Sequence, residues 1–366
     1  MFDYASRRAR ARTQMQQEGM DALLLSLSSH LLYLVGWTDT PGERFLGVLI
    51  TPEREAMIVP RLYADEVAAR AEVTDLRTWE EQASPFEMVA ALAREFRVAR
   101  GRWAVDDGLP FSMVTRLEAA IPGCTLVPAS RVMAPLRAQK EAGEIDRMRQ
   151  AGRITQEAVT ETLAEVRPGL PARDVAAAIE DRMRRKGASS LAGNIVAVGP
   201  TAALPHARAS AEPLKAGEVL LINVGCRFQG YRSDLTRTFA LGEPGAKVHK
   251  AYRAVRDAYE AARGVIRPGM PLGEVDRAAR EVITRAGFGS HFIHRLGHGV
   301  GLDPKEEPYA AAGNLDPCLT WHTFSVEPGV YLPGEFGLRL EDIVVVTEAG
   351  NEALTELPRD LVILPA

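Results

Sequence analysis

Two segments in the second half of the chain carry polar residues in a mirrored arrangement. The first, residues 219–238 (VLLINVGCRFQGYRSDLTRT), has two apolar, β-branched runs around a glycine-containing turn, which is typical of a β-hairpin. Asn223 and Asp234 stand at equal distances from the middle of this turn, so we expect them to face each other across the two strands. Both side chains would then point into one site.

The second segment, residues 324–346 (FSVEPGVYLPGEFGLRLEDIVVV), repeats the arrangement. Glu327 and Glu341 lie symmetrically about Gly334, at the two sides of a turn between strand-like runs. Four inward polar positions, three of them carboxylates, indicate a site for hard cations. His298, in the glycine-flanked segment RLGHGVGL, adds an imidazole, so a carboxylate-rich metal centre is the leading interpretation.

The elements that position these residues divide into two parts. In residues 1–135, short apolar runs alternate with helical patterns, which is typical of an α/β domain. A charged helix over 141–166 then leads into a second domain, residues 140–366. Within the first domain we expect helices at 3–19, 64–71 and 85–96, and strands within 21–28, 33–37 (YLVGW), 45–52, 55–61 and 103–108.

The second domain contains an internal repeat. The segment RPGLPARDV at 167–175 is echoed by RPGMPLGEV at 267–275, and each is followed by a helical pattern that ends at a glycine, Gly187 or Gly287. Each half therefore supplies two helices and a carboxylate-bearing hairpin. A duplicated α+β unit packed about a pseudo-twofold axis would bring the two hairpins face to face.

The composition excludes several classes of protein. A length of 366 residues with 46% apolar and 25% charged residues is typical of a soluble globular protein with about two domains. The net charge of −4 disfavours nucleic-acid binding, and we expect the one basic run, SRRARAR at 6–12, to be a solvated helix face. No apolar run is long enough to cross a membrane or to form a signal peptide, so we expect a cytoplasmic protein.

Five segments in order support a family resemblance: LPHAR at 204–208, INVGCRFQGYRSDLTRTF at 222–239, HRLGHGVGL at 294–302, SVEPGVY at 325–331 and GLRLED at 337–342. On these segments, residues 140–366 resemble the pita-bread metallopeptidase family, which includes methionine aminopeptidases, Xaa-Pro aminopeptidases, prolidases and creatinases. The preceding α/β domain resembles the N-terminal domain of the creatinase and prolidase branch.

The resemblance implies roles for individual residues. In the family, two divalent ions share two aspartates, one histidine and two glutamates. It implies that Glu327 is also the general base, that His206 lies on the substrate side, and that His294 is a further active-site histidine. The metal ligands that it implies here are Asp234, His298, Glu327 and Glu341, with Asn223 in the place of the first aspartate.

Arg339 is a further candidate. It stands two residues before Glu341, so the two side chains alternate onto the same face of a strand. It either orients the carboxylates or forms an ordinary buried ion pair.

Two positions depart from the family pattern. Asn223 replaces an aspartate, and Lys305 in GLDPKEEP replaces the histidine of a GL-x-x-HE-x-P segment. An amide is a weaker ligand than a carboxylate, so we expect one divalent ion per chain (Mn, Co or Zn) or none. Three carboxylates would be balanced by one divalent ion and the ammonium of Lys305, since unpaired buried charge is costly. Independent drift after loss of activity explains the two residues equally well.

Three functions from different classes follow. The first is a Xaa-Pro peptidase with a single ion and weak or no activity, acting on small peptides with proline at the second position. The second is a metal-independent hydrolase of a small amide or amidine, with His206 in the acid-base role, and the third is a non-catalytic binding protein. The resemblance also implies a homodimer, in which the loop WTDTPGER at 37–44 reaches toward the partner's active site.

Overall fold

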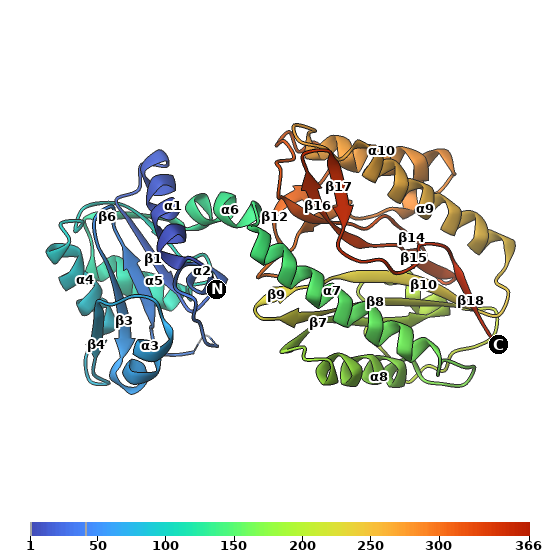
Figure 1. Ribbon diagram of the computed structural model, residues 1–366, viewed down its shortest axis with the longest axis horizontal. Coiled ribbons are helices and arrows are strands. Elements are labelled where there is room, and N and C mark those ends of the chain that lie inside the picture. Colours follow the sequence, from blue (N-terminus) through green and yellow to red (C-terminus); the bar gives the residue numbers. More distant parts are fainter. Residues whose placement is uncertain (1, 41) are drawn as a thin grey trace. The chain divides into compact units, whose positions relative to one another are not determined.

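The computed structural model describes residues 2–40 and 42–366. The chain forms two compact units, of which the first extends to Arg137 and the second is Ala138–Ala366 (Figure 1). The loop at 37–44 includes Pro41, which lies outside the described residues. No described helix combines the length and apolar character that a membrane span requires.

The N-terminal unit is built on a six-stranded mixed sheet in the order β4-β3-β2-β1-β5-β6. Its strands are β1 (Ala22–Ser26), β2 (Gly47–Ile50), β3 (Glu55–Pro60), β4 (Leu76–Trp79), β5 (Gly101–Val105) and β6 (Cys124–Pro128). Its helices are α1 (Tyr4–Gln17), α2 (Ser29–Val35), α3 (Ala64–Arg70), α4 (Pro85–Glu95), α5 (Phe111–Ala120) and α6 (Ser130–Ala138), the last of which reaches the unit boundary. Alternate residues of β1, such as Ala22 and Leu24, share a core with α4 and α5. This confirms the α/β class.

The strand predicted at 33–37 is wrong, because the apolar residues there belong to helix α2. Ser28 caps this helix by accepting a hydrogen bond from the backbone N–H of Leu31 at 3.4 Å. Gly36 ends it in the left-handed conformation, with φ +77°. A short apolar run fits a buried strand and a buried helical turn equally well, so capping residues decide between them.

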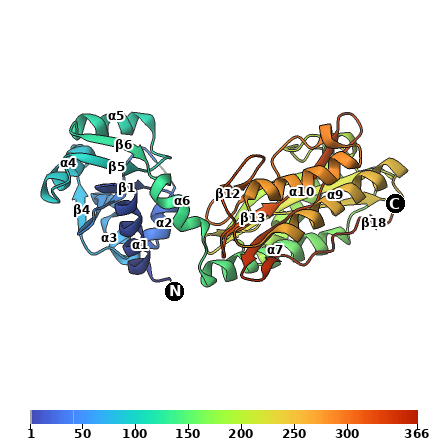
Figure 2. The same cartoon turned by 90° about the horizontal axis from the view of Figure 1, so that it is seen from above.

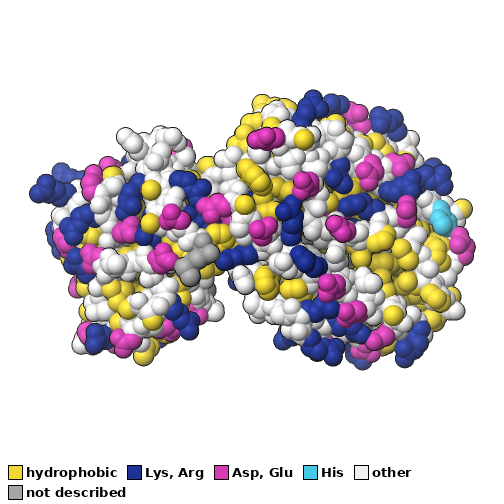
Figure 3. Space-filling view, viewed as in Figure 1, with side chains coloured by type: hydrophobic (Ala, Val, Ile, Leu, Met, Phe, Trp, Pro, Cys, Tyr) yellow, Lys and Arg dark blue, Asp and Glu magenta, His cyan; other side chains and the backbone are white. Residues whose placement is uncertain are grey.

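The solvated helix face predicted at 6–12 is also wrong in part. Arg7 and Arg8 are 1% and 7% exposed. The guanidinium of Arg7 lies over the Tyr33 ring at 4.2 Å and donates to the Tyr33 carbonyl, while Arg8 donates to the Leu34 carbonyl. These arginines tie α1 to α2. Elsewhere, basic and acidic side chains are interspersed on the face shown in Figure 3.

The C-terminal unit contains two larger sheets and four long helices, α7 (Ala142–Leu163), α8 (Ala172–Arg185), α9 (Ala246–Val265) and α10 (Leu272–Arg285). One sheet has the order β18-β10-β8-β7, with β9 paired to β8, and the other has the order β12-β11-β13-β16-β17. The strands of the first are β7 (Ser190–Val198), β8 (Val219–Phe228), β9 (Tyr231–Arg232), β10 (Leu235–Leu241) and β18 (Val362–Leu364). The strands of the second are β11 (Gly297–Gly299), β12 (Glu306–Ala310), β13 (Thr323–Val326), β16 (Asp342–Thr347) and β17 (Gly350–Ala353). The hairpin β14 (Gly329–Leu332) and β15 (Phe336–Arg339) stands apart.

The helices pack on the sheets in pairs. Helices α7 and α8 share a core with β7, β8 and β10, whereas α9 and α10 share one with β13 and β16. Figure 2 shows α9 and α10 side by side along their sheet. In β8, Leu220 and Ile222 face the α7–α8 core, while Val219 and Leu221 face the other core. Asn223 alternates onto the face of Val219 and Leu221, which is the side of the second sheet.

The predicted repeat is confirmed by matching contacts in the two halves. The N–H of Gly169 donates to the Leu214 carbonyl at 2.8 Å, and the N–H of Gly269 donates to the Cys318 carbonyl at 2.8 Å. Both glycines are left-handed, with φ +85° and +83°. The α+β class with a duplicated unit is therefore confirmed for this part of the chain.

Candidate metal centre and active site

The first hairpin has a register that differs from the predicted one. Asn223 lies opposite Thr236, not opposite Asp234. The turn residues are Gln229 and Gly230, both with positive φ, so the hairpin is centred one residue later than expected. The residue opposite Asn223 is therefore Thr236, two positions after Asp234. Residues two positions apart in a strand point to the same face, so Asp234 and Thr236 share one. For this reason the side chains of Asn223 and Asp234 still meet.

The second hairpin has the expected symmetry. The β14–β15 ladder and the β13–β16 ladder are both centred on Gly334, which has φ +78°. Glu327 follows β13, and Glu341 precedes β16. Glu341 also pairs with Thr236 through two backbone hydrogen bonds, 3.1 and 3.3 Å long, which join the two larger sheets at this point.

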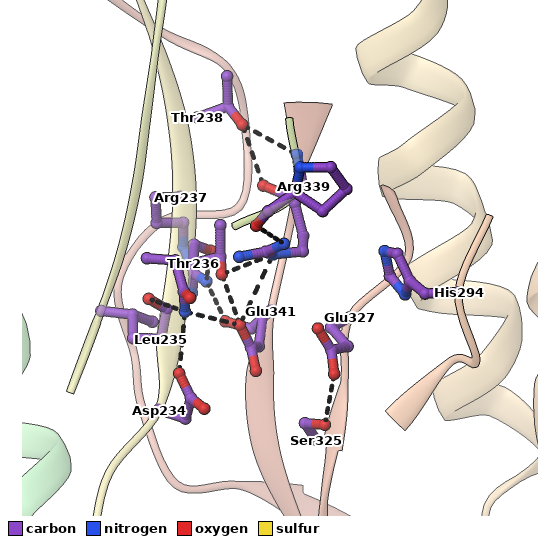
Figure 4. A network of polar contacts seen from close by, with 12 residues as sticks. Asp234, Leu235, Thr236, Arg237, Thr238, His294, Ser325, Glu327, Arg339 and Glu341 are labelled. Carbon is purple, nitrogen blue, oxygen red and sulfur yellow. Dashed lines mark hydrogen bonds and ion pairs between the residues drawn. The ribbon is translucent and has the colours of Figure 1, made fainter. Parts of the chain in front are cut away.

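Asn223 lies between two of the carboxylates. Its amide nitrogen donates to Oδ1 of Asp234 at 2.9 Å and to Oε2 of Glu341 at 3.1 Å. Thr236 Oγ1 donates to the same Glu341 oxygen at 2.5 Å, as Figure 4 shows. The amide thus donates hydrogen bonds to two carboxylates. An aspartate in its place would instead repel them by its negative charge.

His298 and Glu327 form the other side of the site. Nε2 of His298 lies 3.3 Å from Oε1 of Glu327. Its Nδ1 lies 3.1 Å from the Gly299 carbonyl, which can only accept, so Nδ1 carries the proton and Nε2 presents its lone pair. Ser325 contacts both residues, because its hydroxyl accepts a hydrogen bond from the backbone N–H of His298 and donates one to Glu327 Oε1 at 3.2 Å.

All five predicted residues line one cavity of about 190 Å³. The carboxylate oxygens and imidazole nitrogen of Asp234, His298 and Glu341 lie within 4.8 Å of one another, as ligands of one metal ion would. Glu327 stands beside this group. The site can therefore hold a divalent ion with oxygen and nitrogen ligands, while Asn223 offers a hydrogen-bond donor toward it in place of a charged ligand.

The other predicted residues lie on the walls of this cavity or of a second one that adjoins it. His206, Lys305 and Arg339 line both cavities, and His294 lines the second. Nδ1 of His294 donates to the Arg295 carbonyl at 2.7 Å, so its Nε2 accepts, here from the Tyr331 hydroxyl at 3.0 Å.

Arg339 reaches Glu341 chiefly through another side chain. Its Nε is 4.0 Å from Glu341 Oε2 but donates to Thr236 Oγ1 at 3.1 Å, and the Thr236 hydroxyl in turn donates to Glu341. Nη1 of Arg339 donates to the Tyr331 hydroxyl at 3.0 Å. This buried arginine therefore orients the carboxylate through Thr236 as well as through charge.

Burial sets the protonation of the site. It raises the pKa of Glu327 to about 7, with the Glu341 carboxylate adding to the effect and Arg339 and His298 opposing it. Burial and the charge of Asp234 raise the pKa of Glu341, and burial and the charge of Glu327 raise the pKa of Asp234. Burial lowers the pKa of His294 to about 4. A bound cation would reduce the repulsion between these carboxylates and lower their pKa values.

Three residues of this network were not among the sequence-based candidates: Thr236, Ser325 and Tyr331. Thr236 and Ser325 each stand two positions from a predicted ligand, Asp234 and Glu327, so strand alternation places them on the same face. That signal was available in the sequence. Tyr331 has no such signal, because its contacts to His294 and Arg339 arise only from the folding of the second hairpin.

The comparison with protein families agrees with this geometry. The model of metallopeptidase family M24 matches residues 146–348, and that of the creatinase/prolidase N-terminal domain matches residues 7–139. The chain belongs to metallopeptidase family M24. M24 is a family of metallopeptidases, and the two matched regions agree with the fold described above.

Individual M24 relatives cover nearly the whole chain. The probable dipeptidase PepE of Mycobacterium tuberculosis is 37% identical, over 99% of this chain and 97% of that protein. The Xaa-Pro dipeptidase of Lactobacillus delbrueckii subsp. lactis is 33% identical, over 96% and 97%. The crystal structure of dipeptidase PepE from Mycobacterium ulcerans superimposes with a TM-score of 0.94 at 34% identity, over 100% of both chains.

Proposed function

We propose that this M24 protein hydrolyses the bond between an N-terminal residue and proline in small peptides, with one divalent ion per chain. The observation that carries the proposal is the convergence of Asp234, His298, Glu327 and Glu341 on one cavity. The substrate is suggested by a relative that is named Xaa-Pro dipeptidase and is 33% identical over almost all of both chains. Mn²⁺, Co²⁺ and Zn²⁺ are the candidate ions.

The count of one ion rests on Asn223. Its amide donates to Asp234 and Glu341 at hydrogen-bond distance, so it stabilises two carboxylates whose charge a second ion would otherwise balance. A neutral side chain in this place also removes one negative ligand. Asp234, His298 and Glu341 form a compact set for the remaining ion.

The protein groups divide the chemistry between them. Asp234, His298 and Glu341 would hold the divalent ion, which would lower the pKa of a water and polarise the substrate carbonyl. Glu327 lines the cavity beside these ligands and would accept the proton of the attacking water. His206 and Lys305 face the cavity and donate hydrogen bonds to the substrate.

A metal-independent hydrolysis is the second candidate. It is supported by Asn223, whose neutral amide donates to two carboxylates in the place of a charged ligand, and by His206, which lines both cavities. In that reaction His206 exchanges protons with a small amide or amidine. Its pKa is lowered by partial burial and by the charges of Lys305 and Arg339, so it is neutral and able to accept a proton at pH 7.

The test combines metal content with hydrolysis. The purified chain and the double variant Asn223→Asp with Lys305→His are loaded with Mn²⁺, Co²⁺ or Zn²⁺ and assayed on Xaa-Pro dipeptides. We expect one ion and slow cleavage for the unchanged chain, and two ions with at least tenfold faster cleavage for the double variant, which is about 1.4 kcal/mol of barrier. If the unchanged chain holds two ions and cleaves as fast as the variant, the one-ion account is wrong. Hydrolysis that survives removal of all metal would favour the second candidate.

We further propose a cytoplasmic homodimer. The match to the creatinase/prolidase N-terminal domain supports the dimer, and the three cysteines, none in a disulfide, fit a reducing compartment. The loop at 37–44 is the candidate that contacts the partner. Light scattering at micromolar concentration should give twice the mass of one chain, and a monomer under these conditions would exclude the dimer.

A further inference from the structure

A buried ion pair lies behind the segment that carries Lys305. The ammonium of Lys140 is 2.9 Å from Oε1 of Glu306, and the two side chains are 1% and 9% exposed. The same ammonium also donates to the Ala138 carbonyl at 3.4 Å. Oε2 of Glu306 accepts from the backbone N–H of Asp303 at 3.2 Å. Both partners therefore have further hydrogen bonds, which help to offset the loss of hydration of a buried pair.

The backbone around Lys140 is fixed as well. The N–H of Lys140 donates to the Trp321 carbonyl at 2.9 Å, and Gln139 forms a backbone bridge with His322. Trp321 and His322 lead directly into β13, whereas Glu306 begins β12. Since β11 lies between β12 and β13 in the sheet, Lys140 connects the strands on the two sides of β11.

Gly301, which follows β11, leaves room for this ion pair. A Cβ at Gly301 would lie 2.8 Å from Cε of Lys140 and closer still to Oε1 of Glu306, so a larger residue would displace the pair. The pair therefore packs directly on the chain that continues from the proposed metal ligand His298.

Lys305 depends on such support because it is exposed. Its side chain lines both cavities, and Pro304 before it is exposed too. A lysine has a flexible four-carbon stem, so on a mobile segment its ammonium would spend only part of the time in the cavity. Successive residues of a strand point to opposite faces. An interior anchor at Glu306 therefore turns Lys305 toward the cavities.

We propose that Lys140 is a positioning residue, whose buried pair with Glu306 keeps the ammonium of Lys305 in the cavity that it shares with His206. The inference deepens the proposed function, on which it rests only for what Lys305 does there. Removing one partner of a buried pair leaves the other charge uncompensated, so Lys140→Met should displace Glu306 and, with it, Lys305.

The imidazole of His206 reports the place of the Lys305 ammonium. The pKa of His206 is lowered by burial and by the charges of Lys305 and Arg339. An NMR titration of the full chain, labelled with ¹³C on histidine and kept in EDTA, measures this pKa, and the variant His206→Gln assigns the signal. This readout uses no substrate, so it is independent of hydrolysis.

The variants separate the pair from its charges. They are Lys305→Met, Lys140→Met, the double change Lys140→Met with Glu306→Gln, and the double change Lys140→Met with Lys305→Met. Replacing both partners of a buried pair buries no unpaired charge, so the second of the double changes' partners, Glu306→Gln, preserves folding should Lys140→Met alone fail to fold. Lys186→Met is the matched control, because Lys186 also forms an ion pair, with Glu157 at 3.0 Å, but lies outside both cavities.

Lys305→Met should raise the pKa of His206 by about half a pH unit, because a positive charge leaves the cavity. Lys140→Met, alone or with Glu306→Gln, should raise it in the same direction. Lys140→Met with Lys305→Met should give no larger rise than Lys305→Met alone, since both changes act through one ammonium. The control should leave the pKa unchanged.

Three results would overturn the assignment. A pKa of His206 that Lys305→Met leaves unchanged would show that the ammonium is not held in the shared cavity. A pKa that Lys140→Met with Glu306→Gln leaves unchanged, or rises that add when Lys140→Met and Lys305→Met are combined, would show that the pair does not hold Lys305. The expected shifts in a protein that cleaves no Xaa-Pro dipeptide would refute the proposed function alone.

Discussion

Asn223 changes the metal-free site from a repulsive cluster into a hydrogen-bonded one. Its amide donates hydrogen bonds to Asp234 and Glu341. The pKa values of both carboxyl groups are raised, because burial and a neighbouring carboxylate disfavour their charged forms. In the proposed one-ion site, Asn223 therefore stabilises the metal-free protein instead of binding a second ion.

The variant Asn223→Asp tests this stabilising role of the amide. In EDTA it places a carboxylate 2.9–3.1 Å from two others and removes both donors, so we expect a loss of about 1–3 kcal/mol in the free energy of unfolding. Excess Mn²⁺ should reverse the loss, because ligands stabilise the state that binds them. Urea unfolding with and without Mn²⁺ measures both effects. Asn314→Asp, outside the cavity, is the control whose response to Mn²⁺ should match that of the unchanged protein, and an Asn223→Asp variant as stable as wild type in EDTA would contradict the account.

At the scale of elements, a buried hydrogen-bond network stabilises the pairing of Thr236 with Glu341 between the two larger sheets. Arg237 donates to the carbonyls of Thr236 and Glu341 at 2.9 and 2.7 Å and pairs with Asp342 at 2.8 Å. Asp342 also accepts from Tyr259 at 2.7 Å. Since Glu341 precedes Asp342, this network fixes the backbone of a proposed metal ligand from the side opposite the cavity.

The repeated turns at the start of α8 and α10 are the second structural device at this scale. Gly169 and Gly269 occupy the same left-handed position, and a Cβ on either would meet no atom within 4 Å. Alanine at each should therefore cost only the conformational penalty, about 1–2 kcal/mol, and the same amount in both halves. Gly264, which lies within helix α9 and also has open space, is the control, and its alanine variant should be neutral or slightly stabilised. Unequal losses in urea unfolding would show that the two turns are not equivalent.

At the scale of the whole molecule, buried acids and buried histidines give the metal-free protein opposing dependences on pH. The folded state raises the pKa of Glu327 from 4.5 to about 7, so this group contributes stability that is fully present below pH 4.5 and is lost as the pH rises through 7. His294 and His322, whose pKa values are lowered from 6.5 to about 4, act in the other direction: their contribution is present above pH 6.5 and is lost as the pH falls through 4.

Glu327→Gln isolates the acidic contribution. In metal-free protein, the variant should gain stability relative to wild type as the pH rises from 5 to 8, by about 2.5 kcal/mol, because each pKa unit is worth 1.36 kcal/mol and part of the shift lies below pH 5. Urea unfolding in EDTA at pH 5, 6, 7 and 8 gives the difference directly, while the contributions of His294 and His322, whose pKa values Glu327 does not shift, cancel. A difference that stays constant across this range would mean that Glu327 is not strained when ionised.

The sequence by itself determined which residues line the cavity, and it also showed the duplication that places them there. Ligand types and hairpin symmetry are local patterns, and they placed Asn223, Asp234, Glu327 and Glu341 correctly even though the first hairpin pairs Asn223 with Thr236. That error was harmless to the site because a shift of two residues preserves the face of a strand.

Only the tertiary structure decided which neighbours complete the site. The predicted strand at 33–37 is helix α2, because Ser28 and Gly36 cap an apolar run that has no distinguishing period. Arg7 is buried against Tyr33, and Tyr331 reaches His294, through contacts between segments far apart in the chain. Local patterns report the face a residue occupies, but the partner that it meets there depends on how distant elements pack, and no spacing in the sequence encodes that packing.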